Sequence, residues 1–350
     1  EPFASWLLRH GQTARTISRY WATVLVSALN ERLDQMDVGH ARKVFLDGFL
    51  RTRDSYVMEV PTVPLGELYG TRLEGWLSEH EIEVRLKTGV RSVEVEEGSV
   101  TGLQLRDGSQ VDADFVILSA PFNRVLDLLG PSAAQIPSLS QLTEFQSSPI
   151  TGVHLWFDRE VCPLDHAVIV DRSVQWVFNH SALQGRRDPA SSGQYLQLVI
   201  SAAYDLAPLT NEAILQIARD DLGAIWPESR DAQLLRWRVV TEHGATFAVR
   251  PGVEALRPSQ RTSIDGLFLA GDWTHTGWPA TMEGAVRSGY LAAEGVLSDL
   301  GRPEPLVRPD LPEPFLSRLL LGPTQPVRTL PRTESRAVSG AAQVPTAVSS

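Results

Sequence analysis

The stretch 264–294 constrains the fold more than any other part of the chain. A short apolar run, Leu267–Ala270, ends at Gly271 and Asp272, and a loop then leads into a helix rich in small residues. This order predicts a strand, a turn with a carboxylate at the strand's carboxyl end, and a helix whose N-terminus faces the same place. Ligands of open α/β sheets bind there, close to free backbone N–H groups and the positive end of the helix dipole.

The residues of this stretch resemble the C-terminal flavin-binding segment of the amine oxidase / phytoene desaturase superfamily. Within it they are most similar to the squalene-associated FAD-dependent desaturases, also called hydroxysqualene dehydroxylases. The resemblance covers about residues 3–300, and the similar positions are Phe3–Gln12, Ala245–Ala248, Pro251–Gly252, Arg257–Pro258, Ala270–Thr274, Thr276–Val286 and Ser288–Gly289. The C-terminal motif is specific for the superfamily and less so for the dehydroxylase branch.

The resemblance implies an α/β fold in which two domains are interleaved. One is an FAD-binding Rossmann-like domain of the glutathione reductase type with its first βαβ unit missing, and the other is an α+β substrate domain. The expected division is 1–60 for the helical part of the substrate domain, 61–135 for part of the FAD-binding domain, 136–260 for the rest of the substrate domain, 261–302 for the C-terminal FAD-binding segment and 303–350 for a tail. The tail is rich in proline and is expected to be largely disordered.

The phosphate-binding glycine loop of such proteins is not found in this sequence. The chain contains no G-x-G-x-x-G, and no two glycines are spaced as G-x-G. In the resembled family this fingerprint opens the protein and places the FAD pyrophosphate on a helix N-terminus. Because the chain also begins with Glu1, we expect a fragment that binds FAD poorly by itself. The rival explanation is a complete chain that uses another cofactor.

Apolar periodicity and turn residues predict the remaining elements. Helices are expected over 39–52, over 65–80, from Pro121 onward, and over 210–225 with Asn211 as a cap. A buried strand is expected over 115–120. The other expected strands are Ile82–Leu86, Val90–Glu96, Val100–Leu105, Gln110–Val111, Ile150–Phe157, Ala167–Val170, Ser173–Asn179, Tyr195–Ser201 and Leu234–Val240.

Asp272 is the first candidate for a binding residue. In the resembled family the carboxylate at this place accepts hydrogen bonds from the ribityl hydroxyls of the flavin. The ordinary alternative is an aspartate that only caps the following loop. Thr281, Met282 and Glu283 open the next helix, and the backbone N–H of Met282 would face the N1/C2 edge of the flavin, where reduction deposits charge.

The resemblance places further residues at the cofactor and the substrate. Gly271 and Ala120 belong to the expected cofactor site, and Val90 is expected to contact the adenine through its backbone. The aromatic residues Phe247, Trp273 and Trp278 are candidates for the wall of an apolar cavity beside the flavin ring. Taken singly, each of them is more often a plain core residue.

Several kinds of chemistry find no support in the sequence. The net charge of −10 argues against a nucleic-acid partner. No two histidines have the H-x-x-x-H spacing of a metal site, and G-x-S-x-G is absent. No catalytic residue can be named. Amine oxidases of the superfamily commonly keep a lysine near the flavin N5, whereas the strand Ile150–Leu155 has none, which favours an enzyme that acts on lipids.

The resemblance therefore implies an FAD-dependent oxidoreductase acting on a long isoprenoid. The leading expectation is reductive dehydroxylation of hydroxysqualene to squalene with an external electron donor. The alternatives are a carotenoid or phytoene desaturase-like enzyme, a flavin amine oxidase, and an inactive fragment or non-catalytic binding module. The expected location is the cytoplasm, with a peripheral contact at the inner face of the membrane left open. An apolar cluster at Phe315–Leu321 would either pack on the body or touch the membrane.

Overall fold

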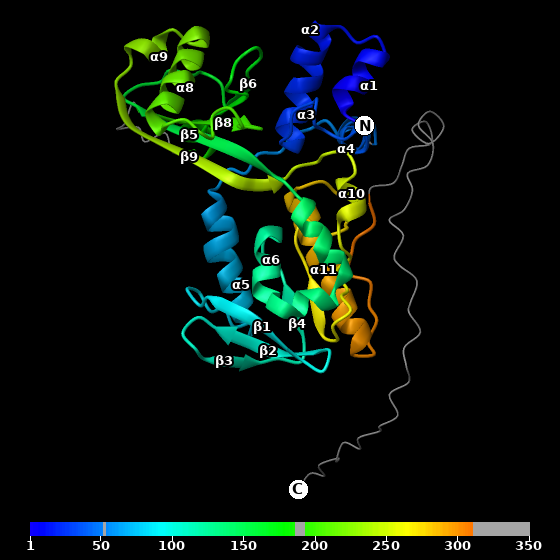
Figure 1. Cartoon of the computed structure of the whole chain (residues 1–350). Helices are drawn as coiled ribbons and strands as arrows, with labels where there is room; N and C mark the ends of the chain where they lie inside the picture. Colours follow the sequence, from blue (N-terminus) through cyan, green and yellow to red (C-terminus); the bar gives the residue numbers. More distant parts are fainter. Residues whose placement is uncertain (52–53, 186–192, 311–350) are drawn as a thin grey trace.

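A computed structural model describes residues 1–51, 54–185 and 193–310 of the chain. The expected tail after 310, with its apolar cluster Phe315–Leu321, lies outside the described residues. Figure 1 shows a sheet with helices at the top, a lower body built from strands and helices, and the N-terminal helices to one side. Within the described ranges, no helix is long and apolar enough to cross a bilayer.

The first fifty residues form the predicted group of helices. Their bounds are α1 Phe3–Arg9, α2 Ala14–Thr16, η1 Ile17–Trp21, α3 Ala22–Leu29, α4 Val38–Phe45 and η2 Leu46–Leu50. Helix α4 begins where the Asp37 side chain accepts a hydrogen bond of 2.8 Å from the backbone N–H of Gly39, an N-cap that satisfies an otherwise unpaired donor. The predicted helix over 39–52 is thus found as α4 and η2.

The lower body begins with the helical turn η3 Glu67–Arg72 and α5 Leu73–Glu79. An antiparallel meander of β1 Val90–Glu96, β2 Ser99–Leu105 and β3 Gln110–Asp112 follows. Gly98 and Gly108 supply the positive φ angles, +83° and +89°, that its two tight turns require. The predicted meander is confirmed, with β1 at its expected bounds.

The predicted strand Ile82–Leu86 is wrong. No described strand lies beside this segment, and its apolar side chains Ile82, Val84 and Leu86 are 46%, 47% and 70% exposed. Alternating apolar residues form a strand only when a neighbouring strand accepts their backbone hydrogen bonds. The strand predicted over 115–120 is shorter than expected, β4 Val116–Leu118, and its Ile117 is 42% exposed because the core covers one face only.

A two-stranded parallel sheet holds the lower body together. Strand β4 pairs in parallel with β10 Leu267–Leu269, although about 150 residues separate them in the chain. Helix α6 Phe122–Leu129 follows β4, with Pro121 as its N-cap residue, and the 3-10 segments η4 Gly130–Gln135 and η5 Pro137–Glu144 come after it. Helix α11 Met282–Asp299 packs against β10.

The sheet body, residues 147–247, is a five-stranded antiparallel sheet in the order β6-β7-β8-β5-β9. The strands are β5 Ser147–Phe157, β6 His166–Val168, β7 Trp176–Asn179, β8 Gln194–Ser201 and β9 Leu234–Phe247, and the helices are α7 His180–Leu183, α8 Asn211–Ile225 and α9 Glu228–Asp231. One face packs against α8 through residues such as Val153, Leu155 and Ile214. Alternation along each strand turns the other face away from α8.

Two details of the sheet body differ from the sequence-based prediction. The N-cap of α8 is Thr210, whose hydroxyl accepts from the N–H of Ala213 at 3.3 Å, so Asn211 is the first helical residue and the predicted cap is wrong. Thr210 has the extended backbone that a cap needs. Strand β9 continues seven residues past its predicted end at Val240, since β5 pairs with it as far as Phe247.

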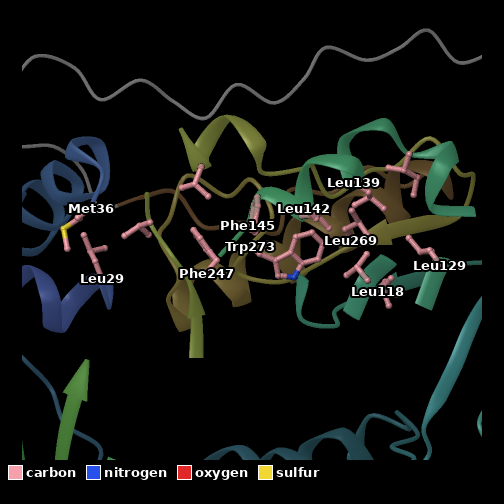
Figure 2. Close-up of a cluster of buried hydrophobic side chains, with 14 of the residues drawn as sticks. Leu29, Met36, Leu118, Leu129, Leu139, Leu142, Phe145, Phe247, Leu269 and Trp273 are labelled. Carbon is pink, nitrogen blue, oxygen red and sulfur yellow. The ribbon is translucent and has the colours of Figure 1, made fainter. Parts of the chain in front are cut away.

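One apolar core joins the N-terminal helices to the lower body. Figure 2 shows it running from Leu29 and Met36 through Phe247 and Trp273 to Leu118 and Leu129. Its members come from both ends of the described chain, and Trp273 and Met36 are 1% and 0% exposed. The helices and the C-terminal segment therefore form one packed unit.

A buried asparagine fixes the helices to the sheet body. Asn30 ends α3 in the left-handed conformation, with φ of 52°, and is 4% exposed. Its amide donates to the Ser148 carbonyl at 3.1 Å and to the Thr246 hydroxyl at 2.9 Å, and accepts from the Ala202 N–H at 2.6 Å. The fully buried carboxylate of Glu31 beside it accepts from Tyr204 at 2.9 Å.

Two substitutions of Asn30 distinguish the contribution of its side-chain hydrogen bonds to stability from that of its backbone conformation. Asn30→Gly tolerates φ of 52° but loses the three buried side-chain hydrogen bonds, so we expect the free energy of unfolding to fall by about 3 kcal/mol. Asn30→Ala should lose a further ~1 kcal/mol because alanine is strained in this region. Urea denaturation measures both. The exposed Asn123→Ala is the control, and equal stability of Asn30→Gly and the parent would show that the hydrogen bonds contribute nothing.

Candidate functional site

The site is built on the sharp turn at the end of β10. The backbone of Gly271 has φ of +137°, and a Cβ there would lie 2.3 Å from Nε1 of Trp273. This indole nitrogen donates to the Ala120 carbonyl at 3.0 Å, so the turn is tied to the end of β4. The Gly271 N–H donates to the buried hydroxyl of Ser288 at 2.7 Å. Only glycine fits this turn, which places Asp272 between β10 and α11.

Helix α11 opens at Thr281, directly beyond the turn. The Thr281 hydroxyl accepts from the N–H of Gly284 at 3.1 Å, while the N–H groups of Met282 and Glu283 belong to the first turn, which a helix cannot pair by itself. A Cβ on Gly284 would lie 2.8 Å from the Pro279 carbonyl, and one on Gly295 would lie 2.3 Å from the Phe268 ring. The small residues thus bring α11 close to the strand, as predicted from the sequence.

Asp272 is a partly buried acid at the centre of this arrangement. Burial raises the pKa of its carboxyl group, and the charge of Arg257 and the Trp273 N–H only partly offset this. Arg257 itself donates to the backbone carbonyl of Asp272, at 2.9 Å. The carboxylate therefore pays a desolvation penalty that hydrogen-bond donors of a bound ligand would reduce.

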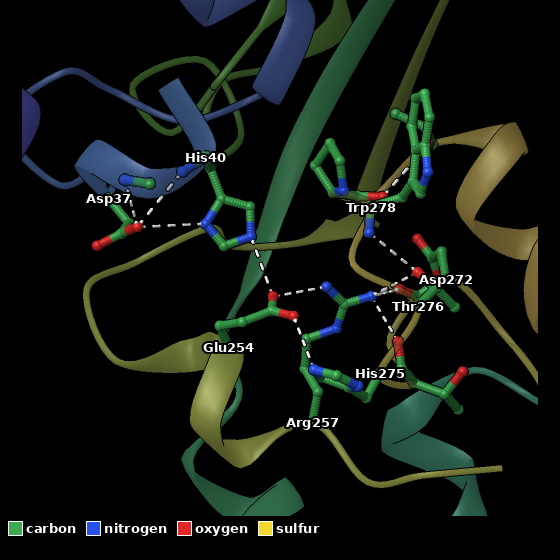
Figure 3. A network of polar contacts seen from close by, with 12 residues as sticks. Asp37, His40, Glu254, Arg257, Asp272, His275, Thr276 and Trp278 are labelled. Atoms are coloured by element: carbon green, nitrogen blue, oxygen red, sulfur yellow. Dashed lines mark hydrogen bonds and ion pairs between the residues drawn. The ribbon is translucent and has the colours of Figure 1, made fainter. Parts of the chain in front are cut away.

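Arg257 holds the loop that follows Asp272, which we call the site loop (residues 271–278). The guanidinium is 5% exposed and donates to the carbonyls of Asp272 and Thr274 and to the Thr276 hydroxyl, the last at 3.1 Å. Its other terminal nitrogen donates to Glu254 at 2.7 Å. Figure 3 shows these contacts converging from helix α10 Val253–Leu256 and the site loop. The loop is thus fixed by a buried charge from another segment.

Glu254 connects Arg257 to two histidines. One carboxylate oxygen lies 3.4 Å from Nε2 of His40 on α4, and the other lies 3.5 Å from Nε2 of His275 in the site loop. Burial raises the pKa of Glu254, but the hydrogen bonds from His40 and Arg257 outweigh it and bring the pKa down to about 2. Glu254 is therefore ionised at every physiological pH.

The site loop ends at Trp278, which lies between two cations. The Lys43 ammonium is 4.3 Å from the centre of a Trp278 ring, and the Arg287 guanidinium is 5.4 Å from it. Lys43 also pairs with Asp47 at 2.6 Å, and Arg287 pairs with Glu283 at 2.9 Å. Cation–π contacts of this kind hold an aromatic side chain in one orientation.

The structure brings most of the predicted cofactor residues together. Gly271, Asp272 and Ala120 meet at the turn, and Thr281, Met282 and Glu283 open the helix beside it. Val90 instead begins β1, paired with Leu105, and its contact with an adenine stays a prediction, as do the cofactor roles of the other six residues.

The predicted cavity wall is mostly buried. Phe247 and Trp273 are 2% and 1% exposed and belong to the core, while Trp278 is partly accessible. Their contact with a substrate stays a prediction. In the described part of the chain, no group of three His, Cys, Asp or Glu residues has the arrangement of a metal site.

Reasoning from sequence missed the residues that hold the site loop. In the sequence Arg257 stands out only through the pair Arg257–Pro258, which resembles the family at that place. Nothing in the sequence marks Glu254 or His40 as part of the site. Gln260 was missed too, although its amide donates to the Thr274 hydroxyl at 3.0 Å and to the His275 carbonyl at 3.1 Å. The one available signal was a cluster of charged and amide residues just upstream of the strand.

The turn at Gly271 should not accept a side chain. Gly271→Ala would push Trp273 out of its place, and we expect the free energy of unfolding to fall by about 3 kcal/mol or more. The matched control is Gly289→Ala in α11, where a Cβ meets nothing within 4 Å, and where alanine should be neutral or add up to ~1 kcal/mol. Urea denaturation with near-UV circular dichroism measures both, and equal behaviour would contradict the tight turn.

The buried Asp272 should destabilise the protein at neutral pH. Burial raises the pKa of Asp272 in the folded state. The folding stability linked to its neutral carboxyl group is therefore fully present below the pKa of the unfolded chain, and it is lost as the pH rises through the folded pKa. Asp272→Asn should therefore be more stable than the parent at pH 7, with little difference at pH 3.5. Urea denaturation at the two pH values tests this. Asp265→Asn, exposed in the same segment, is the control, and a parent that is more stable than Asp272→Asn at pH 7 would refute it.

A family model and several solved structures are similar to this chain. Residues 69–297 match the family model described as flavin containing amine oxidoreductase. An oxidoreductase from Methanosarcina mazei has a similar structure, with a TM-score of 0.64 at 17% identity over 85% of this chain and 68% of that chain. Cyclohexylamine oxidase from Brevibacterium oxydans has a TM-score of 0.61 at 15% identity over 86% and 68%. The mixed α/β fold is thus that of known oxidoreductases.

Known enzymes are similar to this chain in sequence over part of their length. The chain is 31% identical to the tomato 15-cis-phytoene desaturase over 224 residues, which are 62% of this chain and 38% of that protein. It is 34% identical to the hydroxysqualene dehydroxylase of Sinorhizobium fredii over 199 residues, 55% of this chain and 43% of that protein. The match thus spans less than half of each relative. Because the family model covers well over half of this chain, including the whole site loop, the protein belongs to the flavin-containing amine oxidoreductase family.

Proposed function

We propose that this chain holds FAD in an oxidoreductase that acts on a long isoprenoid, with hydroxysqualene as the first candidate substrate. The observation that carries the proposal is the turn at Gly271 and Asp272, packed beside the N-terminus of α11. The turn carries a desolvated carboxylate and bonds through the Gly271 N–H to Ser288 of a helix whose first N–H groups have no partner within the helix. Both are groups that a flavin with a hydroxylated side chain would satisfy.

The residues present fit such a cofactor. Asp272 would accept hydrogen bonds from the ribityl hydroxyls, which repays its desolvation. The N–H of Met282 would face the edge of the ring where negative charge gathers on reduction, since the N-terminus of a long helix favours negative charge. Gly284 lets the start of the helix lie against the Pro279 carbonyl, and the Ser288 hydroxyl ties the helix to the turn at Gly271, while Val90 would contact the adenine.

The preference for an isoprenoid rests on three observations. The chain is 34% identical over 199 residues to a hydroxysqualene dehydroxylase. Strand β5 carries no lysine. The face of the sheet turned away from α8 carries aromatic side chains, among them Trp156 and Tyr195, stacked at 4.5 Å, and the lower body lies on that side in Figure 1. An apolar chain would lie on these rings, beside the Arg236 guanidinium that stands 4.8 Å from the centre of the Trp156 ring.

In reductive dehydroxylation the C–O bond would break and the hydroxyl would leave as water after taking up a proton, and a bound flavin, kept reduced by an external electron donor, would supply the hydride that replaces it. The residues of this chain would bind the polyene and exclude water from it. Trp278, held between Lys43 and Arg287, would form part of the wall with Phe247 and Trp273. A lipid substrate suits a cytoplasmic enzyme with a peripheral contact at the inner face of the membrane.

Desaturation of a carotenoid precursor is the second candidate. The observation that favours it is the 31% identity over 224 residues to a phytoene desaturase. The two reactions move electrons in opposite directions, because a desaturase removes hydrogen from its substrate and needs an electron acceptor. Product analysis with hydroxysqualene and with phytoene therefore separates them.

A flavin titration tests the proposal. Because a chain without the phosphate-binding glycine loop is expected to bind FAD weakly, the titration runs to a large excess of FAD, and binding should shift the flavin bands near about 370 and 450 nm. Asp272→Ala should weaken the affinity about tenfold or more, as expected for lost hydrogen bonds to a charged group. Asp265→Ala, which removes an exposed carboxylate of the same segment, is the control.

The flavin-loaded protein is then reduced and given hydroxysqualene. Squalene as the product supports the dehydroxylase, and an unchanged substrate refutes it. Flavin bands that stay unshifted even at a large excess of FAD, both in the parent and in Asp272→Ala, would refute the flavin site and favour a non-catalytic binding module.

A further inference from the structure

His40 lies between two carboxylates that belong to different parts of the chain. Its Nδ1 is 3.5 Å from Asp37 at the start of α4, and its Nε2 is 3.4 Å from Glu254 on α10. The ring is 7% exposed. The Nδ1 contact is an ion pair and not an aligned hydrogen bond. A neutral imidazole carries one N–H only, so a proton on each nitrogen is needed to face both carboxylates favourably.

We propose that His40, as an imidazolium held between Asp37 and Glu254, positions the site loop through Arg257, so that the loop depends on a proton bound outside the site. The inference that His40 positions the site loop is supported by the contacts alone. Its consequence for cofactor affinity rests on the proposed function.

The contacts form a continuous chain from α4 to the site loop. His40 faces Glu254, and Glu254 accepts from Arg257 at 2.7 Å. Arg257 donates to the carbonyls of Asp272 and Thr274. Because Arg257 is almost fully buried, its orientation depends on the carboxylate that binds its other end. A shift of Glu254 would therefore move the two carbonyls that flank Trp273.

Helix α4, which carries His40, is anchored to the rest of the protein. The Asp37 N–H donates to the Val249 carbonyl at 2.8 Å, and Ala41 is fully buried in the core. The charged and titratable groups around His40 are Asp37 on its own element, Glu254 and Arg257 around α10, and His275 of the site loop behind Glu254. The two carboxylates next to the ring favour its protonated form.

The direction of the pH dependence follows from this arrangement. Burial lowers the pKa of His40, but the contacts with Asp37 and Glu254 outweigh it, so the pKa is raised. A raised pKa means that the stabilisation is fully present below the unfolded value of about 6.5 and is lost as the pH rises through the folded value. Glu254, with a pKa of about 2, stays ionised throughout this range. Order in the site loop should thus decline toward alkaline pH.

Hydrogen exchange of the whole chain tests the positioning without any cofactor. The amides of Thr274, His275 and Trp278 all donate hydrogen bonds in the structure. In His40→Gln, which cannot carry the charge, their protection at pH 6 should fall about tenfold, the order of effect expected for losing a hydrogen bond to a charged group. At pH 9 the variant and the parent should agree. His80→Gln, which alters an exposed histidine on α5 whose Nδ1 contacts the Trp76 carbonyl, is the control.

Unchanged protection of these amides in His40→Gln at pH 6 would overturn the proposal. Should this variant fail to fold, NMR of the unmodified protein decides: the His40 ring must titrate with the same midpoint as the loss of loop protection, and different midpoints overturn the proposal. FAD affinity, measured from pH 6 to pH 9, should fall about tenfold in the parent and stay level in His40→Gln. If loop protection follows His40 but no flavin binds at any pH, the positioning stands and the proposed function fails.

Discussion

The buried guanidinium of Arg257 needs acceptors for its charge and finds them through its two terminal nitrogens, while its Nε has none, and this need constrains the whole site. Removing one partner of a buried charge costs several kcal/mol, about 3–5 in typical cases. The carbonyls of Asp272 and Thr274 are therefore turned inward toward Arg257. The geometry of the site thus follows from a charge that does not belong to the strand–turn–helix motif itself.

The local part of the structure could be predicted from the sequence. Tight turns at glycine bound the meander, so β1 was found at its predicted ends, and the strand, turn and helix at 267–299 follow from apolar runs and small residues. Ile82–Leu86 has the same alternation as a strand but no neighbour to pair with. Periodicity reports which side chains are apolar, and it does not report whether a second strand is present.

The contacts that fix the parts to one another could not be predicted. Asn30 bonds to residues 118 and 216 positions away, and the Glu31 carboxylate accepts from Arg250, 219 positions away. A single asparagine after a helix reads as an ordinary C-terminal cap. The network around Glu254 was missed for the same reason, since His40 lies more than two hundred residues earlier in the chain. Only the folded chain brings these groups within reach of each other.

The shared core has a consequence for how the protein is made. Phe3, Leu7 and Met36 leave the ribosome before Phe247 and Trp273, which follow more than two hundred residues later in the chain, yet all five share one core. Until the later residues emerge, the early helices have no complete surface against which to bury their apolar side chains. Folding of this unit must wait for most of the chain to be synthesised, and during that interval the nascent helices are clients for chaperones that bind exposed apolar segments.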